Sequence, residues 1–168
     1  MKSDSSALAI RPTDQVSVDD HRLQQVWIAT QKRPWRSLAL LSGSSGVPTL
    51  GTANLFAKIS WAYSGTPSAV FDLRDVSLRL LEHHAQNVQL QIQHGERVFI
   101  ALRAASENPT AIPLARMADA VILCIALGKT TTKSASEVMA AVGKERFLGS
   151  IVVDPSSEPT EARAEGGP

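Results

Sequence analysis

The chain has 168 residues, of which 43% are hydrophobic and 20% are charged, and its formal net charge is +1. This length and composition fit one globular domain that buries about two-thirds of its unfolded surface, and they exclude disordered and fibrous proteins. The 17 basic and 16 acidic residues are interspersed along the chain. Because there is no basic stripe of the kind that binds a phosphate backbone, we expect no nucleic-acid partner.

The two ends of the chain differ in composition from the middle. Residues 1–18 are polar with scattered apolar positions, and residues 155–168 are rich in Pro, Glu, Gly and Ser. Both segments are predicted to be flexible. The sequence has no signal-peptide core and no run of roughly 20 apolar residues that would span a bilayer. We therefore expect a single cytoplasmic domain over residues 19–154, with no direct insertion into a membrane.

The hydrophobic pattern predicts alternating strands and helices. In chain order these are a helix over 18–31 capped by Asp19 or Asp20, a strand over 37–42, a helix over 49–64 ending at Gly65, a strand over 68–72, a helix over 76–84, a half-exposed edge strand over 88–93, a strand over 97–102, a helix over 112–118, a strand over 120–127, a helix over 134–142 and a strand over 151–153. The strands alternate with helices, and no hairpin turns are predicted between them. The predicted fold is α/β, with a mostly parallel sheet flanked by helices in a three-layer sandwich.

In a parallel sheet, ligands bind at the carboxyl ends of the strands. This rule points to four loops, over residues 43–49, 72–75, 103–108 and 128–132. The first loop, Gly43–Thr49, joins a strand to a helix, which is the setting of a phosphate-binding loop. However, the lysine that a phosphate-binding loop carries is missing, and Pro48 and Thr49 lie near its expected position. Pro48 also has no backbone N–H to donate to an anion.

Several short motifs follow one another in a recognisable order over about residues 35–154. They are Arg36-Ser-Leu, Ser42-Gly-Ser-Ser-Gly-Val, Ala53-Asn-Leu55, Asp72-Leu-Arg74, Met117-Ala-Asp-Ala-Val-Ile-Leu-Cys124, Lys129-Thr130 and Phe147-Leu-Gly-Ser-Ile-Val-Val153. Their order resembles that of the bacterial tyrosine kinases of capsule and exopolysaccharide export, within the larger group of MinD- and ParA-like P-loop ATPases. The resemblance implies a shortened P-loop fold of this kind.

The chain departs from that family at the positions that carry its chemistry. The loop lysine has no counterpart, and the strand ending at Leu102 runs into Arg103-Ala-Ala where the family has a magnesium-binding aspartate followed by prolines. The tail has no tyrosine for phosphorylation. Without these groups, the charge on a transferring phosphoryl group is not neutralised. The resemblance leaves remnant cofactor-binding positions at Gly43, Ser45, Gly46, Thr49, Asp72 and Arg74.

The resemblance thus predicts a noncatalytic scaffold or regulatory domain with no cofactor and no metal site. Its expected partner is a membrane exopolysaccharide biosynthesis or export protein, or a second subunit of its own, which would hold it peripherally at the inner membrane. The alternative is a divergent ATPase or switch that binds ATP with Mg²⁺ weakly through Gly43–Gly46. Lys58, Lys129 or a partner would then supply the lysine. A third reading is a receiver-like signalling domain with Asp72 as its acidic residue.

Simpler structural roles compete with these functional ones. The small residues of the first loop also suit a tight strand-to-helix turn, and Asp72 can pair with Arg74. Trp35 and Arg36 are the best candidates for contact with a partner outside the core. Cys124 lies inside an apolar run and is expected to be a buried structural thiol.

Overall fold

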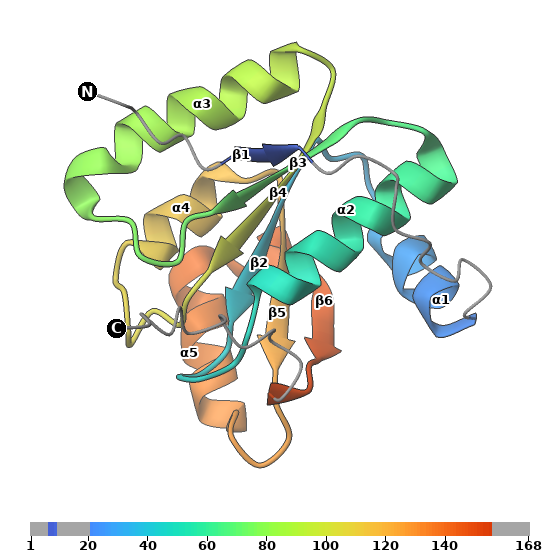
Figure 1. The fold of residues 1–168 in the computed structure, drawn as a ribbon. Coiled ribbons are helices and arrows are strands. Elements are labelled where there is room, and N and C mark those ends of the chain that lie inside the picture. Colours follow the sequence, from blue (N-terminus) through green and yellow to red (C-terminus); the bar gives the residue numbers. More distant parts are fainter. Residues whose placement is uncertain (1–6, 10–20, 156–168) are drawn as a thin grey trace, which may run out of the picture.

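The computed structural model describes residues 7–9 and 21–155. Figure 1 shows its elements, which in chain order are β1 (Ala7–Ala9), α1 (His21–Thr30), β2 (Ser37–Ser42), α2 (Leu50–Ser64), β3 (Ser68–Asp72), the 3-10 turn η1 (Leu78–Leu80), α3 (Leu81–Gln93), β4 (Arg97–Leu102), α4 (Ala111–Met117), β5 (Ala120–Ile125), α5 (Thr132–Val142), the 3-10 turn η2 (Lys144–Arg146) and β6 (Phe147–Val152).

The strands form one sheet in the order β1-β3-β4-β2-β5-β6. Strands β2 to β6 are mutually parallel, and β1 is antiparallel to β3 at one edge. The predicted α/β fold with a mostly parallel sheet is therefore confirmed. The chain runs outward from β2 to β3, returns to β4 beside β2, and crosses to β5 on the other side of β2.

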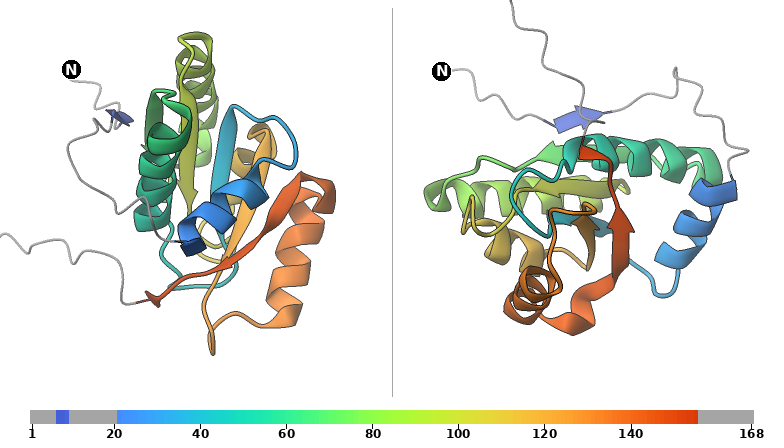
Figure 2. Two further views of the ribbon diagram at one scale, coloured as in Figure 1. Left: turned by 90° about the vertical axis from the view of Figure 1, so that its right-hand side faces the viewer. Right: turned by 90° about the horizontal axis from the view of Figure 1, so that it is seen from below.

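Helices cover both faces of the sheet, as the views in Figure 2 show. On one face, α1 and α2 pack on side chains such as Leu38 and Leu40. On the other, α3, α4 and α5 pack on side chains such as Ala39 and Leu41. All four of these β2 residues are buried. This double cover explains why β2 is a continuous apolar run, since a strand that is solvated on one face would alternate with polar residues.

The predicted edge strand over Val88–Gln93 is wrong, because these residues form the second half of the helix α3. Val88 is buried and Ile92 packs against the same core four residues later. The apolar spacing of Val88 and Ile92 fits one helix face, whereas Leu90 between them is exposed. Because Val88, Leu90 and Ile92 are apolar and alternate with polar residues, this half of the helix has the sequence pattern of an edge strand. The helix predicted over residues 76–84 begins at η1 and continues through Gln93.

The other predicted elements are present with small shifts of their boundaries. Strand β6 is longer than predicted and begins at Phe147. Gly65 ends α2 in the left-handed conformation, with its N–H donated to the carbonyl of Trp61. Strand β1 is not predicted from the sequence; of the segment 1–18, only Ala7–Ala9 is described. The predicted caps Asp19 and Asp20 and the tail over 156–168 lie outside the described residues.

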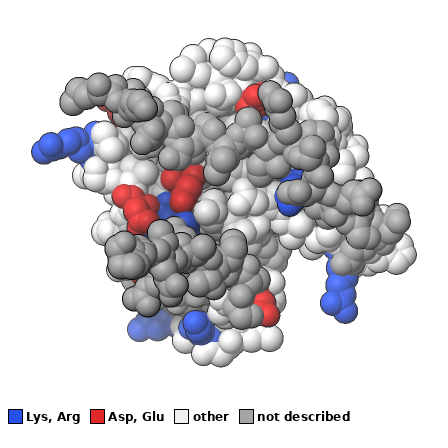
Figure 3. Space-filling model, in the orientation of Figure 1, with Lys and Arg blue, Asp and Glu red and all other residues white. Residues whose placement is uncertain are grey.

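The surface of the described residues carries mixed charge. On the face shown in Figure 3, the basic side chains are separated by uncharged surface, and basic and acidic side chains meet left of the centre. Among the helices of the described ranges, none combines the length and the apolar character needed to cross a bilayer.

Candidate functional site

The candidate site lies where β2, β3, β4 and β5 end. Because β2 leads to β3 on one side and β5 leads to β6 on the other, the switch point of the sheet lies between β2 and β5. The four loops selected from the sequence meet at this edge. Side-chain hydrogen bonds join the first loop to the third and fourth, and the second to the third. We call this region, over residues 43–49, 72–76, 103–110 and 127–131, the carboxyl edge.

Gly43 begins the loop after β2 and packs closely against β5. Its N–H donates to the carbonyl of Cys124 at 2.8 Å, so this amide is not available to an anion. A Cβ atom at Gly43 would lie 3.0 Å from Cγ2 of Thr130 and 3.2 Å from the carbonyl oxygen of Cys124. Ser44 then shares a 2.8 Å hydrogen bond with the hydroxyl of Thr130. Close packing therefore accounts for the glycine at position 43.

The tip of the loop is exposed and is formed by Ser45 and Gly46. Gly46 has a φ of 75°, a conformation that favours glycine. The ammonium group of Lys129 lies 3.6 Å from the position that a Cβ atom would take at Gly46. The hydroxyl of Ser45 donates to the carboxylate of Glu107 at 2.9 Å. The loop tip thus lies between a cation from the loop after β5 and an anion from the loop after β4.

Thr49 precedes the first turn of α2 and faces inward. Its side chain is buried, and its hydroxyl donates to the carbonyl of Leu102 at 3.0 Å. The hydroxyl is therefore turned toward β4 and does not reach the loop surface where a ligand would bind. The assignment of Thr49 as a remnant cofactor-binding residue stays a prediction, and this contact favours a structural role for its hydroxyl. Val47 and Pro48, the two residues before it, are also buried.

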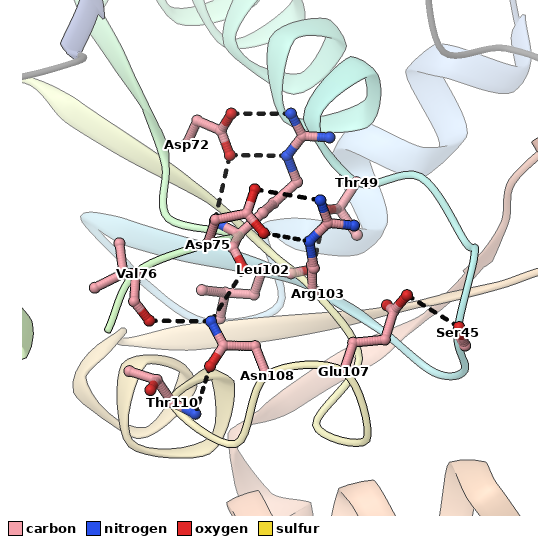
Figure 4. A network of polar contacts seen from close by, with 11 residues as sticks. Ser45, Thr49, Asp72, Asp75, Val76, Leu102, Arg103, Glu107, Asn108 and Thr110 are labelled. Atoms are coloured by element: carbon pink, nitrogen blue, oxygen red, sulfur yellow. Dashed lines mark hydrogen bonds and ion pairs between the residues drawn. The ribbon is translucent and has the colours of Figure 1, made fainter. Parts of the chain in front are cut away.

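The end of β3 carries two ion pairs, shown in Figure 4. Asp72 and Arg74 form a bidentate pair with N–O distances of 2.8 and 2.9 Å. Asp75 pairs with Arg103 at 2.7 Å, and both side chains are exposed. The hydrogen bond from Arg103 lowers the pKa of Asp75, and the same bond raises the pKa of Arg103. These contacts match the simpler structural role of Asp72, which is to pair with Arg74.

Asn108 holds the loop after β3 against the loop after β4. Its side-chain amide donates to the backbone carbonyls of Arg74 and Val76, and its oxygen accepts the N–H of Thr110. Sequence reasoning selected the loops that contain Arg103, Asn108 and Lys129 but assigned Asn108 no role. Its role could have been predicted from its position, because Asn108 comes just before Pro109 and the start of a helix. Asn side chains in such turns bond to nearby backbone groups.

Trp35 and Arg36 lie at the opposite end of the sheet, before β2. Trp35 is only 6% exposed, and its indole N–H donates to the carbonyl of Thr30. Its ring contacts Phe99 edge to face. The expectation that this ring contacts a partner is therefore wrong, since its packing and its hydrogen bond are both satisfied in the core. Arg36 is exposed, and its backbone N–H donates to Asp119.

Two further sequence predictions concern reactive groups. Cys124 is fully buried, and burial raises the pKa of its thiol to about 12. The predicted buried thiol is confirmed. Within residues 7–9 and 21–155, no group of three or more His, Cys, Asp or Glu side chains is arranged to hold a metal ion.

Comparison of the chain with family models, with curated proteins and with solved structures finds no match.

Proposed function

We propose that this chain is a noncatalytic, P-loop-like domain that acts in the cytoplasm as a scaffold or regulator of a membrane exopolysaccharide biosynthesis or export protein. The link to the pathway and to the membrane partner rests on the motif order in the sequence. The noncatalytic role rests on the loop after β2. These two parts of the proposal are tested separately.

The observation that carries the noncatalytic role is the hydrogen bond from Thr49 to Leu102. A phosphate-binding loop needs a hydroxyl that faces a metal ion and a lysine that faces the outer phosphates. Here the hydroxyl faces β4, and no lysine lies in the loop. In addition, Glu107 places a carboxylate beside the loop tip, where it would repel a phosphate. The loop therefore suits a structural turn better than phosphoryl transfer.

A role in binding another protein is supported by exposed leucines near the carboxyl edge. Leu127 follows β5 and is 80% exposed, and Leu78 in η1 is 70% exposed. Single exposed apolar residues are common on protein surfaces. These two nevertheless follow strands that end at the same edge, in the place where an active relative would hold its ligand. A partner that docks on this edge would cover Leu127 after β5 and Leu78 after β3.

Weak binding of a phosphate compound is the second candidate function. It is favoured by the position of Lys129 beside Gly46. Among the described residues, the backbone N–H groups of Ser45 and Gly46 have no acceptor, and α2 begins just after them. Backbone amides near a helix start and a nearby ammonium can bind an anion. In this case Lys129, rather than a lysine in the loop, would neutralise its charge.

Calorimetry with ATP and Mg²⁺ distinguishes the two candidates. The scaffold predicts no binding heat at millimolar nucleotide. The second candidate predicts binding that is lost both in Gly46→Asp, which places a carboxylate in the loop, and in Lys129→Ala. Lys133→Ala is the matched control, because Lys133 lies in α5 and its ammonium is close to Glu137. Micromolar binding that is lost in Gly46→Asp but not in Lys133→Ala would refute the noncatalytic role.

The pathway is tested by complementation in the native host. Deletion of the gene should reduce exopolysaccharide yield, and a copy with Gly46→Asp should restore it, because the loop is not catalytic. Leu127→Asp together with Leu78→Asp should fail to restore it, although the protein accumulates to the same level. An unchanged exopolysaccharide yield after deletion would disprove the link to this pathway. The noncatalytic role would then be tested by the calorimetry alone.

A further inference from the structure

The end of the sheet at which the parallel strands begin brings two arginines together. Arg36 comes just before β2 and Arg97 is the first residue of β4, and these two strands are parallel neighbours. The N–H of Val98 donates to the carbonyl of Arg36 at 2.8 Å. The two arginines therefore lie side by side, at the opposite end of the sheet from the carboxyl edge.

Both side chains lie on the face of the sheet that α1 and α2 cover. Successive side chains of a strand alternate between its faces. Leu38 and Phe99, two residues further along the two strands, both belong to the core beneath α1 and α2. Arg36 is exposed and Arg97 is half-buried. Burial and the nearby positive charge of Arg36 lower the pKa of Arg97, so the two guanidinium groups are close enough to repel each other.

The guanidinium group of Arg97 packs against two tryptophans. Its central carbon lies 5.2 Å from the centre of the Trp27 ring and 4.9 Å from the centre of the Trp35 ring. These contacts stabilise a positive charge, but they provide no oxygen for the N–H groups, which point outward in the plane of the guanidinium. Nη1 of Arg97 is buried and has no hydrogen-bond partner among the described residues. Such a buried donor is rare and indicates an ordered water or a bound ion.

Other arginines of the described ranges have the acceptors that this pair lacks. Each of the following donates from its guanidinium to a carboxylate or to a backbone carbonyl: Arg33, Arg74, Arg103, Arg116 and Arg146. Neither Arg36 nor Arg97 forms an ion pair with a carboxylate of the described residues. Asp119, beside Arg36, accepts the backbone N–H groups of Arg36 and Ser37 instead. Two adjacent positive charges thus have no anion.

We propose that Arg36 and Arg97 form a binding site for a phosphate group, either free phosphate or the phosphate monoester of a lipid headgroup. A planar carboxylate matches a single guanidinium, whereas a phosphate monoester carries about two negative charges and three acceptor oxygens. One phosphate group can therefore neutralise both arginines and accept hydrogen bonds from both. The site goes beyond the proposed function and is separate from the loop after β2.

The two arginines contribute to this site in different ways. The indole of Trp35 is fixed by its hydrogen bond to the carbonyl of Thr30, and its ring meets Trp27 edge to face. Arg97 is therefore already held in one orientation and loses little conformational freedom when an anion binds. The exposed side chain of Arg36 must become ordered on binding. Arg97 thus orients the phosphate group, and Arg36 adds charge from the solvent side.

The first test is a titration of the full chain with inorganic phosphate at constant ionic strength, followed by the indole N–H signals in NMR spectra. The signals of Trp27 and Trp35 should shift and saturate, because Arg97 lies over both rings. The signal of Trp61, which is 38% exposed on α2, is the internal control and should stay in place.

Variants of the two arginines identify the site. Arg36→Gln should raise the dissociation constant about tenfold or more, because it removes charged hydrogen bonds to the phosphate group. Arg97→Gln should abolish saturation. Arg79→Gln, the matched control at an exposed arginine of η1, should leave the dissociation constant unchanged. Because Arg36 is exposed, its variant should fold even where Arg97→Gln does not, and it then decides the test alone.

Sedimentation with vesicles distinguishes the two sources of the phosphate group. The full chain is mixed with phosphatidylcholine vesicles, with and without phosphatidic acid. Binding that requires phosphatidic acid and is lost in Arg36→Gln supports the site and assigns it to a lipid headgroup. Saturation by inorganic phosphate without vesicle binding supports the site and assigns it to a free anion.

Three results would overturn the proposal. The first is the absence of both a saturable shift with phosphate and binding to vesicles. The second is binding that is unchanged in Arg36→Gln and in a folded Arg97→Gln variant. The third is binding that is lost in Lys129→Ala but kept in Arg36→Gln, because the phosphate group would then lie at the loop after β2.

Discussion

The hydroxyl of Thr49 donates a buried 3.0 Å hydrogen bond to the carbonyl of Leu102, which ties the start of α2 to the end of β4. The two residues are 53 positions apart in the chain. The bond turns the hydroxyl away from the surface of the loop. The same contact that stabilises the fold thus removes a group that nucleotide chemistry would use at this position.

Replacement of Thr49 by Val should destabilise the protein by about 1 to 3 kcal/mol, because the shape is kept while the carbonyl of Leu102 loses a buried partner. The measurement is the free energy of unfolding in urea. Thr49→Ser, the control, keeps the hydroxyl and should cost less. Equal losses in both variants would mean that the methyl group of Thr49, rather than its hydrogen bond, stabilises the loop.

Replacement of Trp35 by Ala should cost about 3 to 5 kcal/mol of unfolding free energy, as for other buried aromatic residues. Trp35 contacts Trp27 and Phe99, and Arg97 lies over its ring at 4.9 Å. Trp61→Ala is the control, because this ring is 38% exposed, and it should cost less than half as much. A Trp35→Ala variant of nearly wild-type stability would contradict the core position of this ring.

Removal of Arg103 should raise the pKa of Asp75 toward its ordinary value of 3.8. The pKa of the folded state lies below that value, so the pair stabilises the fold above about pH 4 and its contribution is lost as the pH falls. Both side chains are exposed, so the effect on stability should be small. The measurement is an NMR titration of the Asp75 carboxyl group in Arg103→Gln and, as control, in Arg116→Gln. An unchanged pKa in Arg103→Gln would contradict the pairing.

The thiol of Cys124 should not react with a disulfide reagent at pH 8 in the folded protein, because burial keeps it protonated and out of reach. It should react at once in denaturant. The pKa of about 12 exceeds the ordinary value of 9.0, so this group stabilises the fold below pH 9 and its contribution falls as the pH rises toward 12. Rapid labelling of the native chain would show that the end of β5 opens readily.

Much of the fold could be predicted from local pattern. Apolar runs such as Ser37–Ser42 and Ala120–Ile125 identify buried parallel strands, because a strand covered on both faces has no solvated side. The carboxyl-end rule also selected the loops of the candidate site. The same reasoning failed at Val88–Gln93, where Val88 and Ile92 satisfy the period of a strand and the spacing of a helix turn equally well. Whether a strand or a helix forms here depends on the helix that precedes these residues and on the core side chains against which they pack.

The sequence by itself determined most of the helices and strands between residues 21 and 153, the parallel sheet and the absence of a lysine from the loop after β2, because apolar runs and loop composition are local features of the chain. The tertiary structure decided what the site residues do. Thr49 bonds to Leu102 and Lys129 reaches Gly46 only because β2 lies between β4 and β5, and Asp75 pairs with Arg103 only because β3 lies beside β4. The spacing of apolar residues indicates which face of a helix or strand is buried. It does not indicate which distant segment packs against that face.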